Sequence, residues 1–221
     1  MDARTLRQII EVGETDTVEF KRKFSGFEKI AREMIALANT RGGVLLIGVD
    51  DDGSIVGVPS EKSEIELIEV TAEHYVDPPI EAEIDIVDID GEDVIVVRIP
   101  ESCDKPHRLV VDGLSARREG TGEFAAGVFI RQGERSIAAS NEVARVLAAS
   151  HPETPPLRLE IGEIEQTLFD YLRKHERITV AQYRKLVNIS QRRASRSLVR
   201  LVRAGLVRIF TNEAEDYYTL A

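Results

Sequence analysis

The order of apolar and polar positions along the first 140 residues predicts a mixture of strands and helices. Residues 17–21 alternate between apolar and polar, which is the period of a half-buried strand. Residues 27–39 carry apolar side chains at every third or fourth position, as one face of a helix does. The apolar run 44–49 predicts a buried strand, and the turn at 51–53 predicts that this strand pairs with 55–58 as a hairpin.

The same reasoning gives the rest of this part of the chain. We expect helices over 5–12, 62–75 and 142–149, and Asn141 should cap the last of them. We also expect a hairpin of strands over 82–86 and 93–99 and a further strand over 128–131. The stretch from 100 to 127 is rich in proline, glycine and charge, and we expect no regular element in it. These elements together predict an α+β domain over residues 1–149.

The last sixty residues predict a second, smaller domain. Three prolines between residues 150 and 160 deny a helix its backbone donors, so we place a linker there. The elements expected after it are helices over 164–175, 180–187 and 190–205, followed by strands over 206–210 and 217–220. We expect Thr179 to cap the second helix, Ser190 to cap the third, and Gly205 to end the third. This order is the plan of a winged helix-turn-helix, which we predict over residues 161–221.

Charge is distributed unevenly along the chain, whose formal net charge is −10. Residues 51–100 contain fifteen Asp and Glu against two basic residues. We interpret this acidic block, which repels phosphate, as a solvated edge that discourages aggregation. Residues 171–210 contain eleven Lys and Arg against a single acid. The overall acidity therefore hides a basic module of the kind that binds nucleic acid.

The third helix of this module predicts a nucleic-acid contact. Winding it at 100° per residue places its apolar side chains on one face and five arginines around the opposite one. We expect the amino-terminal end of this face to meet base edges and the later arginines to meet phosphates. The expected contacts are Gln191, Arg192, Arg193, Ser195, Arg196, Arg200 and Arg203.

Composition excludes several other classes of protein. Cys103 is the single cysteine, so an internal disulfide and a cysteine-based metal cage are excluded. No apolar run is long enough to span a membrane and the start lacks the apolar core of a signal peptide, so we expect a cytoplasmic protein. No phosphate-binding loop of the Gly-x4-Gly-Lys type is present, which argues against ATP hydrolysis.

Three stretches occur together in a way that periodicity does not explain. They read ETDTVEFK at 14–21, IALANTRGGVLLIGVDDDG at 35–53 and VFIRQG at 128–133. They resemble the Schlafen AlbA-type domain, also called the divergent AlbA domain, of bacterial and archaeal regulators, where a winged helix often follows it. The resemblance covers about residues 10–140 and implies nucleic-acid binding. It also implies that Arg131 contacts nucleic acid, and Arg117, Arg118 and Arg135 are further candidates.

The resemblance implies a second possibility, because animal Schlafen proteins with this domain include metal-dependent endoribonucleases. Their catalytic acids correspond here to Glu14, Glu19 and Asp50, and their motif lysine corresponds to Lys21. Three such carboxylates suit Mg²⁺ or Mn²⁺, which prefer oxygen ligands, although a structural ion-pair cluster would use the same residue types. The zinc site of the animal proteins is absent, since one cysteine cannot form it.

We therefore predict a nucleic-acid-binding protein, a DNA-binding transcriptional regulator with DNA or RNA as its partner. We also expect a homodimer, because the chain contains one copy of a lobe that the animal relatives duplicate. The alternative is a metal-dependent endoribonuclease that uses Mg²⁺ or Mn²⁺. A third possibility is an interaction scaffold whose basic helix meets an acidic protein. The sequence leaves the target site and any effector open.

Overall fold

The computed structural model describes residues 1–111, 114–115, 124–155, 157–212 and 215–221. The chain forms two compact units, Met1–Ala138 and Ala139–Ala221, here called the first and second units. No helix in the described ranges is both long and apolar enough to cross a membrane.

The first unit is built on a four-stranded sheet with the order β1-β2-β5-β4. β1 and β2 are parallel because α2 crosses over between them, whereas β5 runs antiparallel to both of its neighbours. The elements of this unit are α1 (Ala3–Val12), β1 (Val18–Lys21), α2 (Phe27–Asn39), β2 (Gly43–Ile47), α3 (Glu61–His74), β3 (Val76–Asp77), β4 (Glu83–Ile89), β5 (Glu92–Ile99), β6 (Arg108–Val111), β7 (Leu114–Ser115), β8 (Phe129–Gln132) and β9 (Arg135–Ala138).

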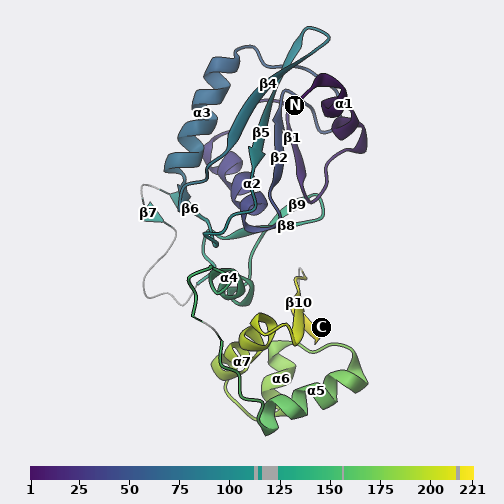
Figure 1. Cartoon of the computed structure of the whole chain (residues 1–221), viewed down its shortest axis with the longest axis vertical. Coiled ribbons are helices and arrows are strands. Elements are labelled where there is room, and N and C mark those ends of the chain that lie inside the picture. Colours follow the sequence, from purple (N-terminus) through teal and green to yellow (C-terminus); the bar gives the residue numbers. More distant parts are fainter. Residues whose placement is uncertain (112–113, 116–123, 156, 213–214) are drawn as a thin grey trace. The chain divides into compact units, whose positions relative to one another are not determined.

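Helices cover both faces of this sheet (Figure 1). Successive side chains of a strand point to opposite faces, so β2 contributes to two cores. Leu45 and Ile47 pack with Met34 of α2 and with α3 on one face. Leu46 packs with Leu6 of α1 on the other face. The class is α+β, as the sequence predicted.

Several short strands lie in segments where the sequence predicted none. β3, β6 and β7 form a small sheet that includes part of the 100–127 stretch. β9 pairs with β8 across a turn in which Gly133 has φ +59°. These strands have two to four residues each, which is too short for an alternating pattern to show.

The hairpin expected between 44–49 and 55–58 does not form as a ladder. A single bridge joins Val49 and Ile55. The carbonyl of Gly48 instead accepts from the amides of Val56 and Gly57, and the amide of Val58 donates to the carbonyl of Asp93. The turn at 51–53 forms as predicted, with the amide of Gly53 donating to the carbonyl of Asp50 at 2.9 Å. The prediction was wrong in the pairing of 55–58, which hydrogen-bonds to Gly48 and to Asp93 of β5.

The Ala-Asn-Thr-x-Gly-Gly motif has a structural role at the end of α2. The buried amide of Asn39 donates to the carbonyls of His107 and Phe129, both at 3.0 Å, and accepts from the amide of His107 at 2.8 Å. A Cβ at Gly43 would overlap the carbonyl of Thr17, and one at Gly42 would lie 2.6 Å from the carbonyl oxygen of Ile99. The motif therefore ties α2 to β6 and β8 and lets the chain pass close to its neighbours.

The second unit contains α4 (Asn141–Ala148), α5 (Glu163–His175), α6 (Val180–Leu186), α7 (Gln191–Arg203), β10 (Val207–Phe210) and β11 (Tyr217–Leu220). β10 and β11 form an antiparallel hairpin, so α5 to β11 follow the element order expected from the sequence. Their core contains Leu168, Tyr183, Leu198 and Tyr218. Ile178 forms a bridge with Tyr218, which attaches the α5–α6 connection to the hairpin.

The helix α4 belongs to the second unit, although the linker was expected after it, at 150–160. The reason is its packing on α7, to which it is joined by hydrogen bonds of Glu142 and Arg145 with Ser195. Its amino-terminal cap is Ser140, whose hydroxyl accepts from the amide of Val143 at 3.1 Å, and the prediction of Asn141 as the cap was wrong.

Candidate nucleic-acid interface and carboxylate cluster

The sequence of α7 places its apolar and basic side chains on opposite faces. Ser190 caps the helix by accepting from the amide of Arg193 at 3.3 Å. Ala194, Leu198 and Leu201 are fully buried in the core of the second unit. Burial of this face fixes the rotation of the helix and leaves the arginines on its other side.

Most of the residues expected to contact nucleic acid on α7 are exposed. Gln191, Arg192, Arg193, Arg196 and Arg200 are exposed, and Arg203 is half-buried. Arg200 donates to the carbonyl of Arg158 at 2.7 Å, while no ion pair joins the other arginines of this face to a described residue. We call Arg192, Arg193, Arg196, Arg200 and Arg203 the α7 arginine face. Because no carboxylate of the described residues neutralises it, the face keeps its positive charge for a phosphate backbone.

Ser195 is the exception among these residues, and its predicted role was wrong. Its side chain is buried, donates to Oε1 of Glu142 at 2.6 Å and accepts from Nη1 of Arg145 at 3.0 Å. Ser195 therefore holds α4 against α7 and cannot reach a base. The pairing of Glu142 and Arg145 with this serine gave no signal in the sequence, because Ser195 lies 53 and 50 positions after them.

Arg131 was expected to contact nucleic acid, and this prediction was wrong because its side chain is fully buried. Its Nη1 donates to Oε2 of Glu19 at 2.7 Å and to Oε2 of Glu33 at 3.3 Å. Its Nη2 donates to the carbonyl of Thr15 at 2.6 Å. The guanidinium joins β8 to β1 and α2 inside the first unit. The burial leaves no surface of Arg131 for a ligand.

Two further side chains complete the cluster around Arg131. Lys21 forms an ion pair with Oε1 of Glu19 and donates to the carbonyl of Phe20 at 2.9 Å. Ser136 of β9 donates to Oε2 of Glu33. Burial raises the pKa of Glu33, against the lowering effect of the Ser136 hydroxyl and of the charge on Arg131. The sequence did not indicate Glu33 or Ser136 as members of this cluster.

The other two predicted catalytic acids have partners of their own. Glu14 accepts from the amide of Phe20 at 2.8 Å, and Asp50 forms an ion pair with Arg22 at 2.6 Å. Burial is the largest cause that raises the pKa of Glu14, and the charges of Glu19 and Asp51 raise it further. Glu14 therefore lies in the electrostatic neighbourhood of Glu19, while Asp50 is tied to a different residue.

Among the described residues, the carboxylates of this cluster do not form a group placed to hold a divalent metal ion. Magnesium and manganese need several oxygen ligands that converge on one point. Within the described ranges, no group of three or more His, Cys, Asp and Glu residues is placed to hold a metal. Both oxygens of Glu19 are already bound by Lys21 and Arg131. The structure thus places Glu14, Glu19 and Lys21 near one another, in a salt-bridge cluster whose cations are Lys21 and Arg131.

Three more arginines were candidate contacts. Arg117 and Arg118 lie outside the described residues. Arg135 is exposed on β9 and takes part in an interaction within the chain.

Comparison with known proteins identifies what the first unit is similar to. The family described as Schlafen, AlbA_2 matches residues 14–140 of the 221 residues. The N-terminal domain of a RecG-related protein from Nitrosomonas europaea is 23% identical over 63% of this chain and 95% of that domain, with a TM-score of 0.44. The DIP2311 protein from Corynebacterium diphtheriae is 17% identical over 72% of this chain and 29% of that one, with a TM-score of 0.43. No curated protein matches the chain.

Proposed function

The chain belongs to the Schlafen AlbA_2 family, and we propose that it is a nucleic-acid-binding protein, specifically a DNA-binding transcriptional regulator. In this proposal the part of the second unit from α5 to β11 is a winged helix-turn-helix that reads duplex DNA through α7. The proposal rests on the element order of three helices and a hairpin and on the charge of α7. The first unit then binds nucleic acid as well or mediates assembly.

The observation that carries the proposal is the α7 arginine face, which is exposed except at Arg203 and has no ion pair with an acid in the described part of the chain. Each arginine that meets a phosphate releases counterions from the duplex, which gives affinity without sequence preference. Arg192 and Arg196 lie in the first half of α7, where side chains of a recognition helix meet base edges. An exposed helix face that serves only solubility usually carries acidic and basic side chains interleaved. The α7 arginine face carries basic side chains and no acidic ones.

The test is a binding assay with labelled duplex DNA and labelled tRNA at low salt, with and without Mn²⁺. The proposal predicts a shifted duplex band whose intensity falls steeply as salt is added. A shifted tRNA band without a shifted duplex band would show that the partner is RNA and not duplex DNA. No shift of either probe would overturn the proposal and favour a scaffold whose basic helix binds an acidic protein.

A metal-dependent ribonuclease is the alternative proposal. The observation in its favour is that Glu14, Glu19 and Lys21 of the family motif share one neighbourhood. Against it stands the engagement of Glu19 by Arg131. The same assay separates the two readings: cleavage of tRNA that requires Mn²⁺ and disappears in Glu19→Gln supports the nuclease. Cleavage that persists in Glu19→Gln points to a contaminating enzyme and removes the nuclease proposal.

A further inference from the structure

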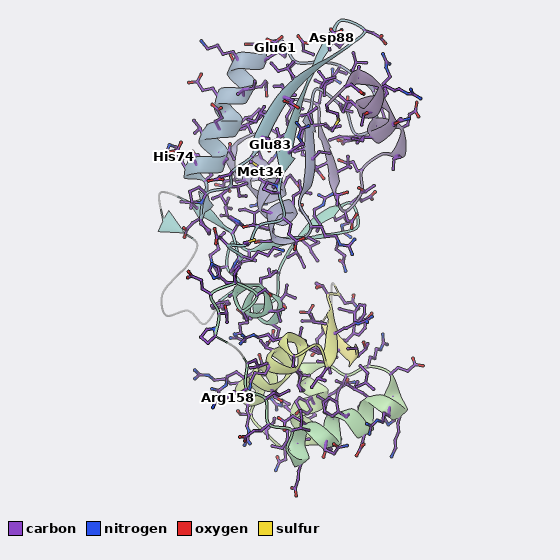
Figure 2. The ribbon with its side chains drawn as sticks, viewed as in Figure 1. Met34, Glu61, His74, Glu83, Asp88 and Arg158 are labelled. Carbon is purple, nitrogen blue, oxygen red and sulfur yellow. The ribbon has the colours of Figure 1, made fainter. Side chains whose placement is uncertain are left out.

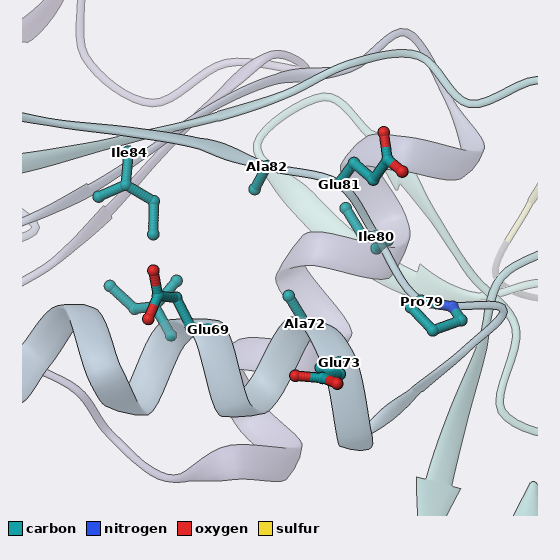
Figure 3. Close-up of a pocket in the computed structure, with 9 residues that line it drawn as sticks. Glu69, Ala72, Glu73, Pro79, Ile80, Glu81, Ala82 and Ile84 are labelled. Atoms are coloured by element: carbon teal, nitrogen blue, oxygen red, sulfur yellow. The ribbon is translucent and has the colours of Figure 1, made fainter.

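A groove of about 370 Å³ lies in the first unit between α3 and the segment that leads into β4 (Figure 3). Its floor is apolar. Ile68 and Ala72 of α3 and Ile80 of the facing segment are at most 8% exposed and belong to the core between the helices and the sheet. Ile68 has no exposed surface and lies beneath this floor. The apolar surface open to a ligand is mainly that of Ala82 and Ile84, which line the groove and are half-buried.

The rim of the groove is acidic. Glu69 and Glu73 stand on α3, and Glu81 stands on the opposite wall (Figure 3). All three are exposed. Among the described residues, none of the three forms an ion pair with a lysine or arginine, and Glu73 lies 4.0 Å from the imidazole of His74. Three carboxylates thus surround an apolar floor, and no lysine or arginine that the structure describes neutralises them.

The strand beside the groove adds a second feature. β4 lies at the edge of the four-stranded sheet, with β5 as its described neighbour. Its exposed side chains include Glu83 and Asp88, which are labelled in Figure 2. An edge strand offers backbone donors and acceptors along its outer side to an extended peptide. Asp88 extends the acidic charge along this edge, whereas Glu83 is paired with Arg98 at 3.3 Å.

We propose that this groove is a docking site for a basic, amphipathic segment of a partner protein. The segment places an apolar side chain against Ala72, Ala82 and Ile84 and pairs its lysines or arginines with the carboxylates of the rim. Burial of apolar surface supplies the affinity, and the carboxylates select basic flanks and repel nucleic acid and acidic chains. The proposal goes beyond nucleic-acid binding and uses no residue of α7.

The test titrates the full chain into three fluorescein-labelled peptides. The first has the sequence Lys-Arg-Leu-Leu-Lys-Arg, the second replaces both leucines by serine, and the third replaces every basic residue by glutamate. We expect the first peptide to bind about tenfold more tightly than the second, because the serine peptide keeps the charge but loses the apolar anchor. The third should not bind.

Two protein variants locate the site. Glu69→Gln with Glu73→Gln should weaken the leucine peptide about tenfold, whereas Glu66→Gln with Glu92→Gln, which removes the same charge outside the groove, should leave its affinity unchanged. If the first variant does not fold, Ala82→Leu, which fills the groove without changing charge, should weaken the same peptide. Equal binding of the leucine and serine peptides, or equal loss in the two charge variants, would show a diffuse charge effect and overturn the docking site.

Discussion

At the scale of single residues, burial decides what each arginine of this chain can do. The sequence predicted that both Arg131, in the motif at 128–133, and Arg196, in the basic third helix of the second domain, contact nucleic acid. The structure buries Arg131 among two carboxylates and backbone carbonyls and leaves Arg196 exposed. The first is a structural counter-ion, and the second keeps its charge for a ligand.

The role of Arg131 predicts a large loss of stability in Arg131→Met. The variant leaves Glu19 and Glu33 buried without their shared cation, which typically costs about 3–5 kcal/mol. Urea unfolding followed by circular dichroism measures the loss. The matched control is Arg22→Met, which removes an exposed ion pair with Asp50 and should cost less than about 1 kcal/mol. Equal stability losses in the two variants would contradict the structural role.

The raised pKa of Glu33 predicts a pH dependence of stability. The ordinary pKa of this carboxyl is 4.5, and its burial makes the folded state hold the proton more tightly than the unfolded chain. This contribution is complete below pH 4.5 and is lost as the pH rises through the raised pKa. The free energy of unfolding should therefore fall over this range, and less so in Glu33→Gln. Glu28→Gln, an exposed change on the same helix, should keep the wild-type slope, and an unchanged slope in Glu33→Gln would contradict the assignment.

At the scale of elements, α4 is part of the second unit, and this predicts how the unit can be isolated. A fragment of residues 139–221 should unfold cooperatively at a higher temperature than one of residues 150–221, which lacks α4. Ser195→Ala should cost about 1 kcal/mol in the longer fragment, because it removes the hydrogen bond to Glu142. The same change in the shorter fragment should cost nothing. Equal melting temperatures of the two fragments would show that α4 is not part of the fold.

Long, periodic elements could be predicted from the sequence, and short or long-range features could not. The period of 27–39 predicts α2 with the limits the structure gives, and the motif stretches predict the family. The two-residue strands β3 and β7 are too short to carry a period. The burial of Arg131 depends on partners more than ninety residues away, and alternation along β8 carries no information about them.

At the scale of the whole molecule, acidic and basic charge lie in different parts of the chain. The acidic residues of 51–100 belong to the first unit and the basic residues of 171–210 to the second. The net charge of −10 is therefore a sum over both units and does not describe the charge of α7 by itself.

We expect the chain to form a homodimer, which would present two copies of α7 to half-sites related by two-fold symmetry. Sedimentation equilibrium should give about twice the chain mass of 24.7 kDa. The measurement is repeated with duplex DNA present. A monomer under both conditions at micromolar concentration would contradict the dimer and the expectation of a palindromic site.

The most direct test of nucleic-acid binding by α7 compares the wild type with Arg192→Ala/Arg196→Ala in titrations of labelled duplex DNA. Duplexes are first enriched from a random library by the wild-type protein. Each arginine that reads a base contributes about 1–3 kcal/mol, so the double variant should lose its preference for the enriched duplex over a random one. Arg173→Ala, an exposed change on α5, should keep that preference. An unchanged preference in a folded double variant would contradict the account, since α7 would then not be the element that reads the nucleic acid.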